Sequence, residues 1–264
     1  MTNDTALNDR SIFYIKTLKP LGTIFRGFLA VAVILLCWET ANRILNVPIW
    51  LVPKPSDFLF RLATDFHLIT GHALFTSKTL LLGFGLGMII AIPLAFIITS
   101  IPFLERGFFP LIVFLNIMPK TIIGPILVIW LGLNPLVAVL IVFLMCFFPI
   151  LVDSMTGFRT IDERLFLVTR SMGANKFQTF ILIRLPGAMR SILGGLRIGI
   201  LKAVEGVILA EFIASQAGLG FLIMQASSFM DMPLIFATLI ATGLLAVTFN
   251  FCLFGLEKIL VPWL

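Results

Sequence analysis

The stretch TIDERLFLVTRSMGANKFQTFILIRLP, Thr160 to Pro186, decides the fold because it places charged residues between two long apolar segments. Thr160 and Glu163 have the spacing of a capping box, which predicts a helix start, and Gly173 predicts the end of that helix. Asn175 is predicted to cap a second short helix. Pro186 is predicted to close it because proline has no backbone N–H. We expect a helical hairpin outside the membrane.

The first helix of this hairpin is predicted to be amphipathic. Leu165, Val168 and Met172 recur at three- and four-residue spacing and form one apolar stripe. A stripe of this kind on a segment that lies outside the membrane requires a partner groove.

The composition places the rest of the chain in a bilayer. Of 264 residues, 59% are hydrophobic and only 12% are charged, which excludes a soluble globule with a polar surface. Hydrocarbon offers no water to backbone amides, so apolar runs of about twenty residues suit membrane-spanning helices. The runs lack the alternation of barrel strands. The predicted fold class is therefore an all-α integral membrane protein.

Six membrane crossings are predicted, and five is the main alternative because the third segment is short and ends at Pro119. The sequence divides into a cytoplasmic N-terminal segment, 1–23, and a transmembrane domain, 24–264, that includes the polar loop 159–190. The predicted spans are Ile24–Thr40, Leu80–Thr99, Gly107–Met118, Pro125–Val152, Ile192–Ile213 and Leu234–Leu256.

The distribution of Lys and Arg predicts that both termini are cytoplasmic. Residues 159–190 contain six basic residues, whereas the last external loop, Ala214–Pro233, contains none. The first external loop is an exception with four basic residues, although its length weakens its influence on orientation. We expect a multi-pass protein of the cell (inner) membrane.

Motifs for catalysis and nucleotide binding are missing from the sequence. It has no GxxxxGK[ST], HExxH or GxSxG motif. His67 and His72 are five residues apart in the first external loop, and we interpret them as ordinary loop histidines. No catalytic residue, metal or cofactor is expected. A membrane enzyme remains a weak alternative because no nucleophile and base pair is recognisable.

The fifth predicted span is unusually polar. Lys202 and Glu205 lie deep within it, where each charge costs about 2.5 to 3.5 kcal/mol on insertion scales. Pairing at i, i+3 is the simplest compensation and predicts a satisfied pair that faces the helix bundle. The alternative is that one of the two lines a solute path. Arg197 and Glu211 lie near the ends of the span and are expected to snorkel.

A second candidate for the path is the segment Asn116–Pro125, where Pro119 is flanked by Asn116 and Lys120. Broken helices free backbone carbonyls, which are tolerated at membrane depth only against protein or a wet cavity. A plain surface turn is the alternative interpretation.

Two GxxxG patterns predict close helix contacts. Gly83 with Gly87, and Gly195 with Gly199, lie on one helix face each. Contact within one subunit is the first interpretation, and contact across a dimer axis is the second.

The hairpin carries a resemblance to a known family. Gly173, nine further residues and then Ile183-x-Leu185-Pro186 form a pattern similar to the cytoplasmic loop of ATP-binding-cassette importer permeases. Other stretches resemble the nitrate, sulfonate and taurine subfamily. They are VPKPSDFL (52–59), LERGFFPLIVFLNIMPKTIIGPILVIWLGL (104–133), FFPILVDSMTGFRTID (147–162), GGLRIG (194–199) and AEFIAS with GLGFLI (210–223).

The resemblance implies a type I importer permease with about six transmembrane helices and a cytoplasmic coupling-helix hairpin. Such a permease dimerises, as a homodimer or heterodimer, receives solute from an external binding protein and is driven by two cytoplasmic ATPase subunits. The implied solute is a small anion such as nitrate, a sulfonate, taurine or bicarbonate, with a flavin or a pyrimidine vitamin precursor as the alternative. A secondary transporter is the rival function, for which Glu205 is the deep ion-site candidate.

The resemblance also assigns residues. ATPase coupling is implied for Glu163, Leu167, Val168, Thr169, Gly173, Ala174 and Pro186. The translocation path is expected at Asn116, Lys120, Lys202 and Glu205 from the polar fifth span and the break at Pro119, independently of the resemblance. The family usually has Glu-Ala-Ala where this chain has Leu167, Val168 and Thr169. Glu163, one turn earlier, is the candidate substitute for the missing acid.

Overall fold

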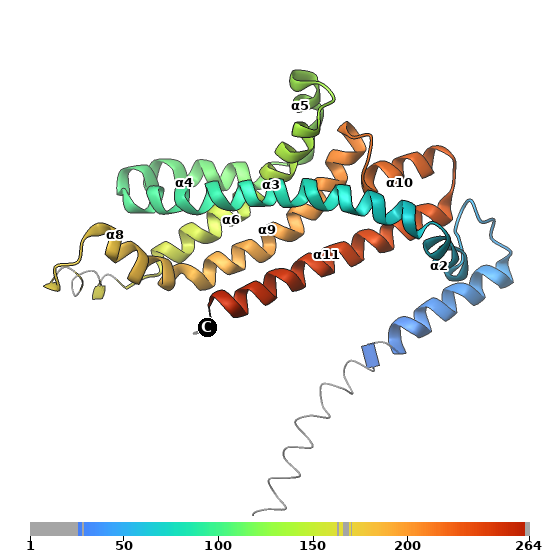
Figure 1. Cartoon of the computed structure of the whole chain (residues 1–264), viewed down its shortest axis with the longest axis horizontal. Helices are drawn as coiled ribbons and strands as arrows, with labels where there is room; N and C mark the ends of the chain where they lie inside the picture. The colour runs from blue at the N-terminus through green and yellow to red at the C-terminus, as the bar shows by residue number, and fades with distance from the viewer. Residues whose placement is uncertain (1–25, 28, 163, 166–168, 170, 262–264) are drawn as a thin grey trace, which may run out of the picture.

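The computed structural model describes residues 26–27, 29–162, 164–165, 169 and 171–261, and every regular element in this part of the chain is a helix (Figure 1). Residues 29–45 form the first long helix. The later helices are α2 (Pro55–Thr64), α3 (Phe66–Ser100), α4 (Pro102–Ile117), η1 (Lys120–Ile122), α5 (Ile123–Leu131), α6 (Pro135–Arg159), α8 (Lys176–Thr179), η2 (Phe180–Arg184), α9 (Leu185–Ala214), α10 (Leu219–Ser228) and α11 (Met232–Leu260).

The core forms where α6 packs between α3 and α9, and glycines allow the close approach. A Cβ atom on Gly83 or Gly87 of α3, or on Gly195 or Gly199 of α9, would lie within 2.8 Å of a side-chain atom on α6. Real Cβ atoms do not approach so closely, so the small residues are required for this packing. The prediction that the GxxxG faces make contacts within one subunit is confirmed.

Three helices, α3, α6 and α11, are long and apolar enough to cross a membrane alone. Two bent pairs also qualify: α4 with 120–131, bent by 74°, and 177–214 with α10, bent by 50°. The described residues thus hold up to five spans, which confirms the all-α membrane fold class. The first predicted span, Ile24–Thr40, lies partly outside the described residues, and its later part belongs to the helix at 29–45.

The prediction of one span from Pro125 to Val152 is wrong. The helix α5 ends at Leu131 and α6 begins at Pro135. Gly132 has φ +74°, which ends the first helix, and the Asn134 side chain accepts a hydrogen bond from the Leu136 amide at 3.0 Å, which caps the second. Continuous hydrophobicity concealed this break because it lies between two apolar helices.

The two ends of the bundle carry different short elements. In Figure 1, α8 lies at one end of the long helices α6 and α9, whereas α2 and α10 lie at the other end. Helix α3 begins earlier than predicted, at Phe66, so His67 and His72 lie on a helix instead of in a loop.

Candidate functional site

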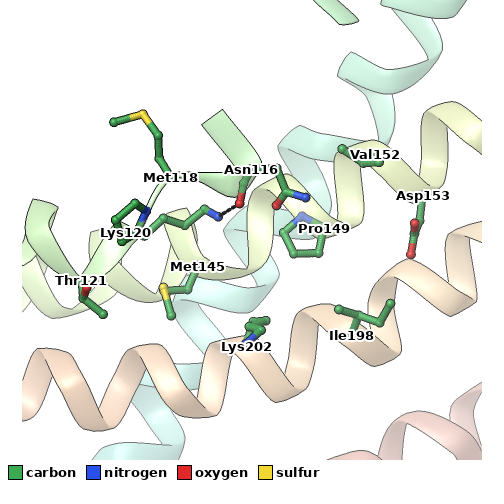
Figure 2. Close-up of a pocket in the computed structure, with 11 residues that line it drawn as sticks. Asn116, Met118, Lys120, Thr121, Met145, Pro149, Val152, Asp153, Ile198 and Lys202 are labelled. Carbon is green, nitrogen blue, oxygen red and sulfur yellow. Dashed lines mark hydrogen bonds between the residues drawn. The ribbon is translucent and has the colours of Figure 1, made fainter. Parts of the chain in front are cut away.

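A cavity of about 450 Å³ lies where the α4–α5 break faces α6 and α9 (Figure 2). Three of the four residues expected on a translocation path, Asn116, Lys120 and Lys202, line it, whereas Glu205 does not. The cavity lining comprises Asn116, Met118, Pro119, Lys120, Thr121, Met145, Pro149, Val152, Asp153, Ile198 and Lys202.

Lys120 is held at the break by the end of the preceding helix. Its Nζ donates a hydrogen bond to the backbone carbonyl of Asn116 at 2.7 Å and lies 5.3 Å from the centroid of the Phe148 ring. The last carbonyls of a helix have no partner within the helix and carry partial negative charge, so they attract a cation. The ammonium group is thereby positioned at the cavity.

Lys202 and Glu205 form the predicted ion pair, with Nζ 2.7 Å from the nearer carboxylate oxygen. The prediction that this pair faces the bundle is wrong. The two side chains are 44% and 57% exposed, on a face of α9 that the described helices of this chain leave uncovered. The i, i+3 spacing fixed the pairing but gave no information on which face of α9 the other helices would cover.

Asp153 is a cavity residue that our sequence analysis did not single out. It is half-buried, is the single acidic residue of α6, and makes no hydrogen bond or ion pair within the described part of the chain. The signal was available in the sequence, because one carboxylate in a long apolar helix is costly without a partner.

Glu211 forms a buried link between three helices. Its side chain is fully buried, and its Oε2 accepts hydrogen bonds from the Thr76 hydroxyl at 3.0 Å and the Gly220 amide at 2.8 Å. The expectation that Glu211 snorkels to the membrane surface is therefore wrong. Its partners come from α3 and α10, which lie far from it in sequence.

The corner between α9 and α10 is completed by two further bonds from α3. Thr76 Oγ1 accepts from the Leu219 amide at 2.8 Å, and His72 Nδ1 accepts from the Gly218 amide at 3.0 Å. The first backbone amides of a helix have no acceptor within that helix. At the start of α10, side chains of α3 accept the hydrogen bonds from these amides. His72 is thus a structural residue of this corner.

The hairpin begins differently from the prediction. The Thr160 hydroxyl donates to the Gly157 carbonyl at 2.9 Å, because α6 extends to Arg159 and Thr160 lies at its C-terminal end. The side chain of Asp162 instead accepts a hydrogen bond from the Arg164 amide at 2.9 Å and acts as the cap. The capping role predicted for Thr160 is wrong, and its predicted partner Glu163 lies outside the described residues.

Gly173 ends the first hairpin helix as predicted. It has φ +72°, and the Ala174 amide bonds to the Thr169 carbonyl at 3.0 Å. A left-handed residue followed by this bond is the Schellman motif. A side chain at Gly173 would meet no atom within 4 Å, so the requirement for glycine comes from the backbone.

The second hairpin helix starts at the predicted cap. Asn175 Oδ1 accepts from the Gln178 amide at 2.7 Å, and Gln178 Oε1 accepts from the Asn175 amide at 2.9 Å. Pro186, however, does not close this helix. Residues 180–184 form a π-helix in which the Leu185 amide bonds to the Phe180 carbonyl, and the chain continues into α9. The wider turn accommodates the proline within a longer helix.

The hairpin exposes large apolar side chains. Met172, Phe177 and Leu182 are each more than two-thirds exposed. Among the predicted coupling residues, Thr169 is half-buried, whereas Glu163, Leu167 and Val168 lie outside the described residues.

No group of three or more His, Cys, Asp or Glu side chains that is able to hold a metal ion occurs among the described residues.

Comparison with known proteins shows the family. Residues 83–264 match the binding-protein-dependent transport system inner membrane component family. The chain is 30% identical to the riboflavin transport system permease protein of Chloroflexus aurantiacus, over 87% of each chain. It is 29% identical to the formylaminopyrimidine transport permease protein of Halalkalibacterium halodurans, over 87% of this chain and 92% of that protein. It is 26% identical to the taurine transport system permease protein of Escherichia coli, over 88% and 87% of the two chains.

Membership of this family implies a separate ATPase and a solute-binding protein as partners. The role expected from the sequence, transport instead of catalysis, is confirmed. The chain belongs to the binding-protein-dependent transport system inner membrane components and is a permease subunit of an ATP-binding-cassette importer.

Proposed function

We propose that this permease carries a small anion along the cavity at the α4–α5 break. The observation that carries the proposal is the pair of ammonium groups, Lys120 and Lys202, on the lining of one cavity. Cationic groups on the lining of a cavity attract an anion. Nitrate, a sulfonate, taurine or bicarbonate fits this chemistry.

The relatives are named for riboflavin, formylaminopyrimidine and taurine transport, so flavins and pyrimidine precursors are the alternative substrate class. None of the residues that line the cavity is aromatic. A flat heterocycle is usually held by stacking on aromatic rings, and this lining offers none. The cavity therefore favours the anion.

We propose that a second permease copy, in a homodimer or heterodimer, closes the cavity. Ile198, Leu201, Glu205 and Phe212 are exposed on one face of α9, the face that also carries Lys202. A face that combines an ion pair with apolar side chains suits a wet protein interface better than lipid. The translocation path would then run between the two copies.

We also propose that the hairpin docks on the ATPase and that both termini, with the segment 1–23, are cytoplasmic. The exposed side chains of Met172 and Phe177 provide the apolar contact that a docking helix needs. The basic residues of 159–190 support a cytoplasmic position for the hairpin. Arg197 on α9 pairs with Glu257 near the end of α11, which places the C-terminal end of α11 along the hairpin half of α9.

The test is uptake into vesicles that contain the permease, its ATPase and its external binding protein. Labelled nitrate, bicarbonate, ethanesulfonate, 2-aminoethanesulfonate and riboflavin serve as probes, each with and without ATP. We expect ATP-dependent uptake of an anion, and Lys202→Met should reduce it by about tenfold, the effect of losing one charge-assisted hydrogen bond.

Three outcomes would contradict the proposal. Uptake of riboflavin and of no anion would refute the substrate class. Accumulation without ATP would refute coupling to the ATPase. Unchanged uptake and substrate preference in Lys202→Met, at equal expression, would remove Lys202 from the path.

A further inference from the structure

Asp153 faces the cavity without a partner. Lys202 is paired with Glu205, and Lys120 is bonded to the Asn116 carbonyl, but the Asp153 carboxylate has no such contact in the described part of the chain. Acidic side chains in apolar membrane helices are rare and usually face a partner or a wet cavity, so an unpaired carboxylate of α6 on a cavity lining is a candidate functional position.

The carboxylate and the lysines occupy different parts of the cavity. Gly195 of α9 packs directly against Asp153, since a Cβ there would lie 2.8 Å from the Asp153 Cβ. Lys202 is seven residues further along α9, which is about 10 Å by helical rise. Figure 2 shows Asp153 beside Ile198 at one end of the lining residues and Lys120 toward the other. The cavity thus has an anionic end and a cationic end.

We propose that this cavity recognises a small zwitterion, with an anionic group at Lys120 and Lys202 and a protonated amine at Asp153. The inference rests on the proposed function, because it takes the cavity as part of the solute path. It narrows the substrate class from anions in general to anions that also carry an alkylammonium group.

A protonated amine fits Asp153 better than a metal ion does. Magnesium and calcium require about six or more oxygen ligands, and Asp153 is the single carboxylate on the lining. An ammonium group needs one carboxylate and bonds to it with a charge-assisted hydrogen bond. The apolar neighbours Val152 and Ile198 suit the methylene groups between the two charges of a short zwitterion.

The experiment compares two probes that differ only in the amine. Binding of labelled 2-aminoethanesulfonate and ethanesulfonate is measured at millimolar concentration on the permease–ATPase complex in lipid nanodiscs, without the external binding protein. We expect the wild type to prefer the aminosulfonate by about tenfold, the contribution of one hydrogen bond to a charged group. Asp153→Asn should remove this preference, and ethanesulfonate should bind at least as tightly as it does to the wild type because a negative charge has left the cavity.

Two further variants separate the site from folding. Asp153→Glu keeps the charge and should retain most of the preference. Asp57→Asn removes a carboxylate from α2, outside the cavity, and should retain the full preference, since asparagine can still accept the hydrogen bond from the Lys54 amide. Copurification of the ATPase checks that each variant is folded.

The proposal is overturned if the wild type binds both sulfonates equally, if it binds neither, or if Asp153→Asn keeps the preference. It is also overturned if Asp153→Asn dissociates the permease dimer, because Asp153 would then serve the subunit interface. Any of these results refutes the zwitterion site. If ATP-driven uptake of an anion is intact at the same time, the proposed function still holds. Loss of ATP dependence for every solute refutes the proposed function itself.

Discussion

Gly218→Ala is expected to disrupt the corner between α9 and α10. Gly218 has φ +109° and ψ 167°, a backbone region that is almost restricted to glycine, and other residues pay about 1–3 kcal/mol to occupy it. An added Cβ would also lie 2.1 Å from the carboxyl carbon of Glu211. The alanine therefore strains its own backbone and displaces the Glu211 side chain.

The displacement is costly because Glu211 is fully buried and has no solvent to enter. Moving its carboxylate breaks the hydrogen bonds from Thr76 and Gly220, and each buried group left unsatisfied costs about 1–3 kcal/mol. Together with the backbone strain, the expected loss is at least about 3 kcal/mol, a large part of the stability of a typical domain.

The assay is thermal unfolding of the purified transporter, with Gly243→Ala as the matched control. Gly243 lies within α11 and has no atom within 4 Å of its added Cβ, so alanine there should be neutral or slightly stabilising. We expect Gly218→Ala to melt at least about 6 °C lower than the wild type. If the two alanine variants melt together, the corner does not depend on this glycine and the argument fails.

Two further predictions concern the hairpin and the opposite end of the bundle. The Gly173→Arg variant should insert in the membrane but lose transport-linked ATP hydrolysis. The Gly173→Asn variant should retain this hydrolysis because asparagine tolerates positive φ. Equal hydrolysis in both variants would count against the hairpin as the coupling element. Asp231→Asn removes the ion pair with Arg61 but keeps an acceptor for the Leu234 amide. The midpoint of thermal unfolding should therefore fall by only about 1–3 °C, and by less in high salt. A larger decrease would show that this half-exposed ion pair is stronger than its exposure suggests.

The sequence predicted features that depend on neighbouring residues. The left-handed end at Gly173, the cap at Asn175 and the pair of Lys202 with Glu205 all involve partners within five positions. Local geometry of this kind follows from residue type and spacing alone. The glycine faces were also predictable, because only small residues permit the observed contact between α3, α6 and α9.

Some predictions failed because local signals were weighed wrongly, and others failed because contacts between distant helices decide the outcome. Pro186 was expected to end a helix, yet a π-turn before it allows the helix to continue into α9. The break at Gly132 was missed because the surrounding hydrophobicity was given more weight than Gly132, Asn134 and Pro135, which are residue types that end one helix and start the next. His72 was assigned to a loop because α3 was expected to begin at Leu80. Its structural role was missed because its partner, the Gly218 amide, lies 146 residues away.

Three acidic residues of α6 and α9 show the same distinction. Glu205 finds its partner one turn away, and sequence spacing identifies that pair. Glu211 finds its partners in other helices, and only the fold identifies them. Asp153 has no hydrogen-bond or ion-pair partner in the described part of this chain. Because no described residue of this chain pairs with Asp153, we expect its partner to be a solute in the cavity that Asp153 shares with two lysines.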